Sequence, residues 1–60
     1  MKNYNIVASN ETQKQNILNI IKTAGAILTA VSGYGSGYYI QLDATPSQAD
    51  AINTLLEASA

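Results

Sequence analysis

The chain has neither cysteine nor histidine among its 60 residues. No disulfide or thiolate metal site can therefore form, and the usual nucleophile–base pairs of covalent catalysis are missing. The remaining metal ligands are four carboxylates without the spacing of a calcium loop: Glu11, Asp43, Asp50 and Glu57. Serine and threonine hydroxyls have no base paired with them in a recognisable pattern. We therefore predict a protein that is not an enzyme and holds no metal or cofactor.

Charge is also scarce, because Asp, Glu, Lys and Arg make up only 12% of the chain and arginine is absent. Three lysines and a net charge of −1 provide little positive charge to neutralise phosphates, which argues against nucleic-acid binding. A surface that is short of charge suits one covered by other copies, since interface centres are depleted in Lys, Glu and Asp. A neutral surface without functional meaning is the simpler alternative.

The shortness of the chain predicts one domain, residues 1–60, with a marginal core. Small domains are commonly stabilised by disulfides, a metal or oligomerisation. With the first two excluded, a homo-oligomer is expected. Residues 1–10 contain no apolar signal-peptide core, and the longest nearly apolar run, residues 24–31, is too short to cross a bilayer. These observations predict a cytoplasmic protein that does not bind membranes.

The first third of the chain predicts a strand followed by a helix. Alternation over residues 2–8 indicates a half-buried strand, with Tyr4, Ile6 and Ala8 on one face. Asn10 fits the N-cap of a helix, with Gln13 at the spacing of a capping box. The apolar stripe continues to about residue 24, and the glycine that follows is typical of a helix end.

The remainder predicts a hairpin and a second helix. Residues 26–32 and 38–43 are expected as strands, with the turn at residues 33–37. Residues 45–48, Thr-Pro-Ser-Gln, combine an N-cap, a first-turn proline and a capping-box glutamine. The helix that they begin is expected to fray over residues 58–60.

Alternation along residues 26–32 would place Ile27, Thr29 and Val31 on one face and Ala26, Leu28, Ala30 and Ser32 on the other. Neither face carries a charge, so the pattern is compatible with a strand that is covered on both faces.

The predicted order is β-α-β-β-α, an α+β fold with the ferredoxin-like order but without its last strand. Right-handed crossover places both helices on one face of a three-stranded antiparallel sheet, with the first strand beside the third. The first strand then has a free edge that only Lys2 protects. The predicted assembly surfaces are this edge, which another copy or a partner's strand could join, and the helix-free face of the sheet. The predicted interface residues are Asn3, Tyr4, Asn5 and Val7.

The hairpin is the predicted ligand site. Glycines allow close backbone approach and anion-binding N–H groups, and tyrosine rings can stack on a base. The G-x-G-x-G pattern precedes a strand, so it is neither a dinucleotide fingerprint nor a P-loop. The candidate residues are Gly33, Tyr34, Gly35, Ser36, Gly37, Tyr38 and Tyr39. The simpler alternative is a flexible hairpin tip, with tyrosines that pack in the core or a subunit contact.

These features favour a non-catalytic homo-oligomer that binds a small, anionic, nucleotide-like ligand, for example a phage-encoded protein that sequesters host nucleotide signals. Two alternatives stay open. One is a protein–protein interaction module, an inhibitor or adaptor, that uses the open edge of the first strand. The other is a small structural or assembly subunit.

Overall fold

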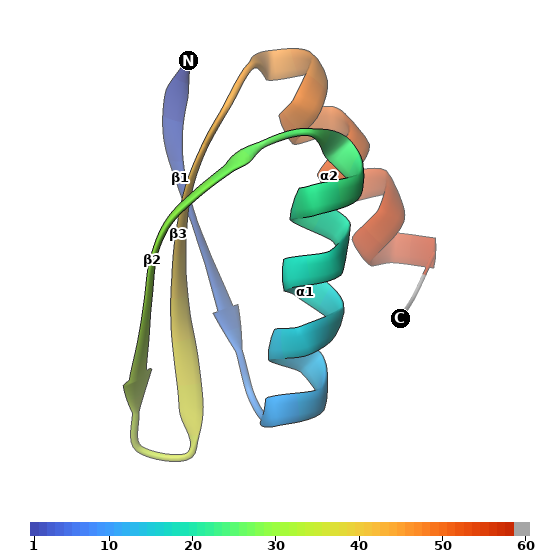
Figure 1. Cartoon of the computed structure of the whole chain (residues 1–60). Helices are drawn as coiled ribbons and strands as arrows, with labels where there is room; N and C mark the ends of the chain where they lie inside the picture. Colours follow the sequence, from blue (N-terminus) through green and yellow to red (C-terminus); the bar gives the residue numbers. More distant parts are fainter. Residues whose placement is uncertain (59–60) are drawn as a thin grey trace.

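The computed structural model describes residues 1–58 and has the predicted element order (Figure 1). The elements are β1 (Lys2–Ala8), α1 (Glu11–Ala24), β2 (Ile27–Tyr34), β3 (Gly37–Ala44) and α2 (Pro46–Ala58). This arrangement confirms the α+β class and both predicted helices. Of the residues expected to fray, Ala58 still belongs to α2, and residues 59–60 lie outside the described residues.

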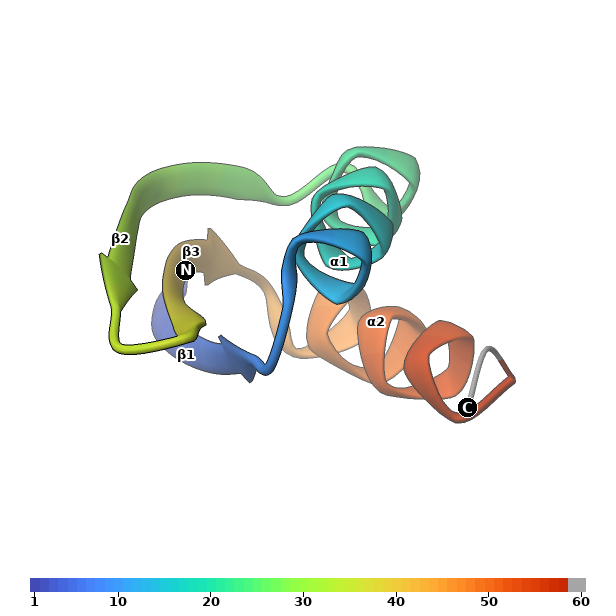
Figure 2. The same cartoon turned by 90° about the horizontal axis from the view of Figure 1, so that it is seen from below.

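The three strands form one antiparallel sheet in the order β1-β3-β2, with both helices on the same face (Figures 1 and 2). The position of the first strand beside the third is confirmed. Because β3 is central, its backbone pairs on both sides, whereas β1 and β2 are the two edges of the sheet. The ferredoxin-like order without a fourth strand therefore leaves two edges that lack a strand partner within residues 1–58.

The core lies between the helix side of β3 and the two helices. Ile40 and Leu42 are almost fully buried and point toward the helices, whereas Gln41 points to the helix-free face. The apolar stripe of α1 packs against Ile40 and Leu42. Burial of such large aliphatic side chains is the main source of stability. The buried cluster is Ala8, Ile17, Ile20, Ile21, Ile40, Leu42, Ala44 and Ile52.

Both helices begin with the predicted caps. The Asn10 side chain accepts a hydrogen bond of 2.8 Å from the Gln13 amide, which satisfies one free N–H group of the first turn. The Gln13 side chain accepts from the Ser9 amide and hydroxyl, one residue before the position that a capping box predicts. At α2, Thr45 and Gln48 exchange the two hydrogen bonds of a complete capping box.

The end of α1 is tied to the start of α2. Gly25 adopts a left-handed φ of 81°, and Ala26 donates to the Ile21 carbonyl, so the helix ends in a Schellman motif. The Gln48 side chain donates to the Gly25 carbonyl at 3.0 Å. One glutamine therefore completes the cap of α2 and fixes the end of α1 against it.

The hairpin differs from its prediction in two ways. First, the turn is Gly35-Ser36 rather than residues 33–37, because Gly33, Tyr34 and Gly37 belong to the strands. Second, a β-bulge between Leu28 and Ala30 makes Thr29 the extra residue. Strict alternation was therefore wrong here.

Because of this bulge, Val31 lies opposite the buried Ile40 on the helix side, as Leu28 lies opposite Leu42. Ile27, Ala30 and Ser32 lie on the helix-free face.

Candidate functional site

The edge strand β2 carries four of the six exposed large apolar side chains of the described chain. Ile27 is 53% exposed, Leu28 44%, Val31 39% and Tyr34 54%. No residue of β2 is charged, and only Ala30 is less than exposed. Edges of sheets are normally protected by lysine, proline, bulges or covering elements. Within residues 1–58, β2 has only its single bulge as protection.

The exposure of β2 follows from the position of the helices. Helix α1 contacts all three strands and α2 contacts β3, but Figure 2 shows the hairpin half of β2 away from both helices. Leu28 and Val31 therefore point to the helix side but are only partly covered there. Ile27 and Tyr34 lie on the opposite face, which no helix covers. An apolar strand that is exposed on both faces is the feature of this molecule that most resembles an interface.

The β1 edge, where the interface residues were predicted, is more polar. Tyr4 packs against the core, and the Asn3 side chain donates to the Leu42 carbonyl and to Asp43 Oδ1. Asn5 is exposed on the helix-free face, and Val7 is 55% exposed. These residues remain a predicted interface, but two of the four are already engaged within the chain.

The three hairpin glycines have separate structural reasons. Gly35 has a φ of 54° at the first position of the two-residue turn, where a type II′ hairpin favours glycine. A Cβ on Gly37 would lie 2.7 Å from the Ala8 carbonyl oxygen, so this glycine allows β1 and β3 to approach. A Cβ on Gly33 would only touch the Tyr38 ring at 3.8 Å. Two of the three glycines are thus explained by backbone geometry, without a ligand.

The tyrosines of the predicted ligand site do not converge. Tyr39 lies opposite Val7 and Ser32 on the helix-free face, where Tyr34 also lies. Tyr38 lies on the helix side of the sheet. The sheet itself separates Tyr38 from the other two rings. Ser36 is exposed at the turn.

Tyr38 belongs to a polar cluster with the first turn of α1. Lys14 Nζ lies 3.0 Å from Glu11 Oε1 and 4.7 Å from the centre of the Tyr38 ring. Hydrogen bonds from Tyr38 and Lys14 lower the pKa of Glu11 to about 2. The same carboxylate raises the pKa of the Tyr38 hydroxyl. The cluster joins the hairpin to α1, and each of its three polar groups already has a partner within it, which indicates a structural role.

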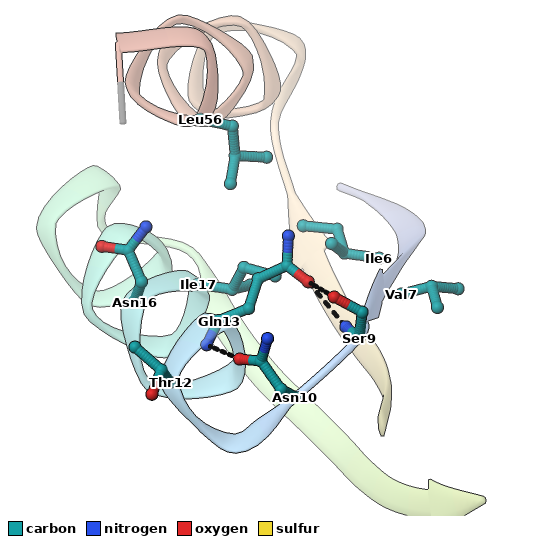
Figure 3. Close-up of a pocket in the computed structure, with 9 residues that line it drawn as sticks. All are labelled: Ile6, Val7, Ser9, Asn10, Thr12, Gln13, Asn16, Ile17 and Leu56. Carbon is teal, nitrogen blue, oxygen red and sulfur yellow. Dashed lines mark hydrogen bonds between the residues drawn. The ribbon is translucent and has the colours of Figure 1, made fainter. Parts of the chain in front are cut away.

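A cavity of about 570 Å³ lies between the end of β1, the start of α1 and the last turns of α2 (Figure 3). Figure 3 shows the Gln13 side chain crossing it toward Ser9, with Leu56 on the far wall. Its lining combines amides and hydroxyls with aliphatic side chains and includes no charged residue: Ile6, Val7, Ser9, Asn10, Thr12, Gln13, Asn16, Ile17 and Leu56. The cavity does not include the predicted hairpin residues.

Residues 1–58 lack two further kinds of site. No three acidic residues gather in a group that could hold a metal ion. No helix among these residues is long and apolar enough to cross a bilayer. Sequence reasoning missed the cavity and the Glu11–Lys14–Tyr38 cluster. The uncharged stretch at residues 27–34 was the signal that could have identified the exposed edge.

Comparison with known proteins gives no match: no family model, no curated protein and no solved structure is significantly similar to this chain.

Proposed function

We propose that the protein is a non-catalytic interaction module that self-associates through the edge strand β2. The observation that carries this proposal is the combination of an open edge, four large exposed apolar side chains and no charge on one strand. Such a strand offers unpaired backbone hydrogen-bonding groups along its edge and apolar side chains on both faces that a partner can bury. Addition of another strand uses both features without further chemistry.

The size of the chain supports the same conclusion. A core of eight buried aliphatic side chains is small, and domains of this size gain much from oligomerisation. Covering a half-exposed aliphatic side chain contributes about 1 kcal/mol, half of the ~2 kcal/mol for complete burial. The exposed aliphatic side chains of β2, together with the half-exposed Tyr34, can therefore offset part of the ~4–15 kcal/mol that association costs. Assembly through β2 therefore requires no large additional surface.

Sedimentation equilibrium on two matched valine variants tests the proposal. Val31→Lys introduces a charge at the β2 edge, and Val7→Lys makes the same change at the β1 edge, where the valine is also exposed. The wild type and Val7→Lys should associate as concentration rises from about 1 μM to 1 mM, the range that brackets a weak interface. Val31→Lys should remain monomeric while its circular dichroism stays native. A monomeric wild type, or equal association of both variants, would refute the proposal.

A second candidate function is small-molecule binding, which the cavity beside α1 supports. Its volume of about 570 Å³ lies in the range of ordinary ligand sites, and its lining combines apolar walls with amide groups. The absence of lysine from that lining favours an uncharged polar ligand over the nucleotide-like anion expected from the sequence.

Amide NMR spectra recorded with a library of small polar fragments test this candidate. Binding should shift the signals of Asn10 and Gln13, and Tyr34→Ala should leave those shifts unchanged because Tyr34 is not part of the cavity. Shifts confined to Tyr34 and Tyr39 would instead support the hairpin as the ligand site. No saturable shift anywhere would argue against a small-molecule role.

A further inference from the structure

The register of β2 allows its self-association to be specified. We infer that two copies pair through residues 30–34 as antiparallel strands around a two-fold axis at Ser32, which makes one sheet in the order β1-β3-β2-β2-β3-β1. This inference rests on the proposed function and names both the partner, a second copy, and the residues that meet.

The bulge limits which part of β2 can pair regularly. Thr29 interrupts alternation, whereas residues 30–34 follow the partner strand without a register shift. The regular free edge is therefore five residues long, with Ser32 at its centre. A two-fold axis through Ser32 uses all five residues in each copy, whereas an axis further toward Ile27 would place the bulge inside the new pair.

The side chains at this edge complement one another in that register. Ala30 of one copy lies opposite Tyr34 of the other on the helix-free face, and Val31 lies opposite Gly33 on the helix side. Each large side chain therefore meets a small one, and both faces of the junction can pack. No residue of β2 is charged, so two copies approach without like charges in the contact.

Between two copies, pairing of β2 with β2 also fits better than pairing of β2 with β1. Pairing one edge with the other is head-to-tail and gives a ring or an open filament, whereas pairing β2 with itself closes after two copies. The β1 edges then become the ends of the six-stranded sheet. They carry Lys2 and the asparagines, which are suitable residues for an edge that stays in water.

Disulfide trapping tests the register cleanly because the chain has no cysteine of its own. Residues directly opposite in an antiparallel pair have Cα atoms about 4.5–5.5 Å apart, within the reach of a disulfide. Ser32→Cys should therefore form a covalent dimer under mild oxidation at least ten-fold faster than the control Asn5→Cys, which lies exposed on β1. A mixture of Ala30→Cys and Tyr34→Cys should link to each other faster than either links to itself.

The outcomes separate this inference from the function on which it rests. Rapid Ser32→Cys dimers together with the mixed Ala30–Tyr34 link would establish the register. If the wild type dimerises in sedimentation but Ser32→Cys links no faster than Asn5→Cys, or if Val31→Cys links fastest, the register is wrong while association through β2 survives. A wild type that stays monomeric up to about 1 mM, which corresponds to an association free energy weaker than about −4 kcal/mol, would refute both.

Discussion

Substitution of alanine for each hairpin glycine should give three different results, because the three positions differ in geometry. At Gly37 the new Cβ would lie 2.7 Å from the Ala8 carbonyl oxygen, a backbone atom that can move only if β1 separates from β3. Forcing extra volume into such a contact costs about 1–3 kcal/mol, and the lower entropy of the unfolded alanine chain recovers ~0.4–1 kcal/mol. We expect a net loss of about 1–2 kcal/mol for Gly37→Ala.

The other two glycines serve as matched controls. Gly33→Ala places a Cβ at ordinary contact distance, 3.8 Å from the Tyr38 ring, so stability should be unchanged or rise by up to ~1 kcal/mol. Gly35 has open space around it but a φ of 54°, so alanine there should cost about 1 kcal/mol through backbone strain alone. The expected order of stability is Gly33→Ala, wild type, Gly35→Ala, Gly37→Ala.

Urea and thermal unfolding followed by circular dichroism measure this order. Each kcal/mol shifts the midpoint of so small a domain by about 4–8 °C, so Gly37→Ala should unfold about 4–16 °C below the wild type. All four proteins must be compared at one low concentration, because self-association adds stability. A Gly37→Ala variant as stable as Gly33→Ala would show that β1 and β3 do not approach as described, and the structural explanation of the glycines would fail.

Three further predictions concern the helix ends. Asn10→Ala removes the N-cap of α1 and should lower the unfolding free energy by about 1 kcal/mol in urea, and an unchanged midpoint would contradict the capping bond. The pKa of Glu11 is lowered from 4.5 to about 2, so its stabilising contribution is present above pH 4.5 and lost as pH falls toward 2. Tyr38→Phe should flatten this acid dependence in thermal unfolding, and an unaltered profile would argue against the hydrogen bond. Gln48→Ala breaks the second capping box and the bond to Gly25, and should cost about 1–2 kcal/mol; a wild-type melting curve would count against that link.

The backbone of the fold was largely predictable because its signals are local. The caps at Asn10 and Thr45 and the left-handed end at Gly25 depend on residues within one turn. Alternation was sufficient for β1, whose two faces differ in polarity. The element order then restricted the sheet to one arrangement, since crossover connections are right-handed.

The candidate site was harder to predict because it depends on tertiary geometry. The residues of β2 are uncharged on both faces, so the sequence pattern does not indicate the bulge at Thr29. The faces of β2 were therefore assigned wrongly from alternation. The closeness of Gly37 to Ala8 depends on how β1 ends beside β3, residues far apart in the sequence. The absence of charge from β2 was visible, but its exposure depends on which strands the helices cover.

Concentration-dependent amide exchange, measured residue by residue by NMR, tests the central claim most directly. It identifies the edge that becomes protected and shows at the same time whether the copies associate. Raising the protein concentration should slow exchange at outward-facing amides of residues 30–34 and leave β1 (Lys2–Ala8) unchanged. Protection that grows on β1 alone, or exchange on β2 that is independent of concentration, would contradict assembly through β2.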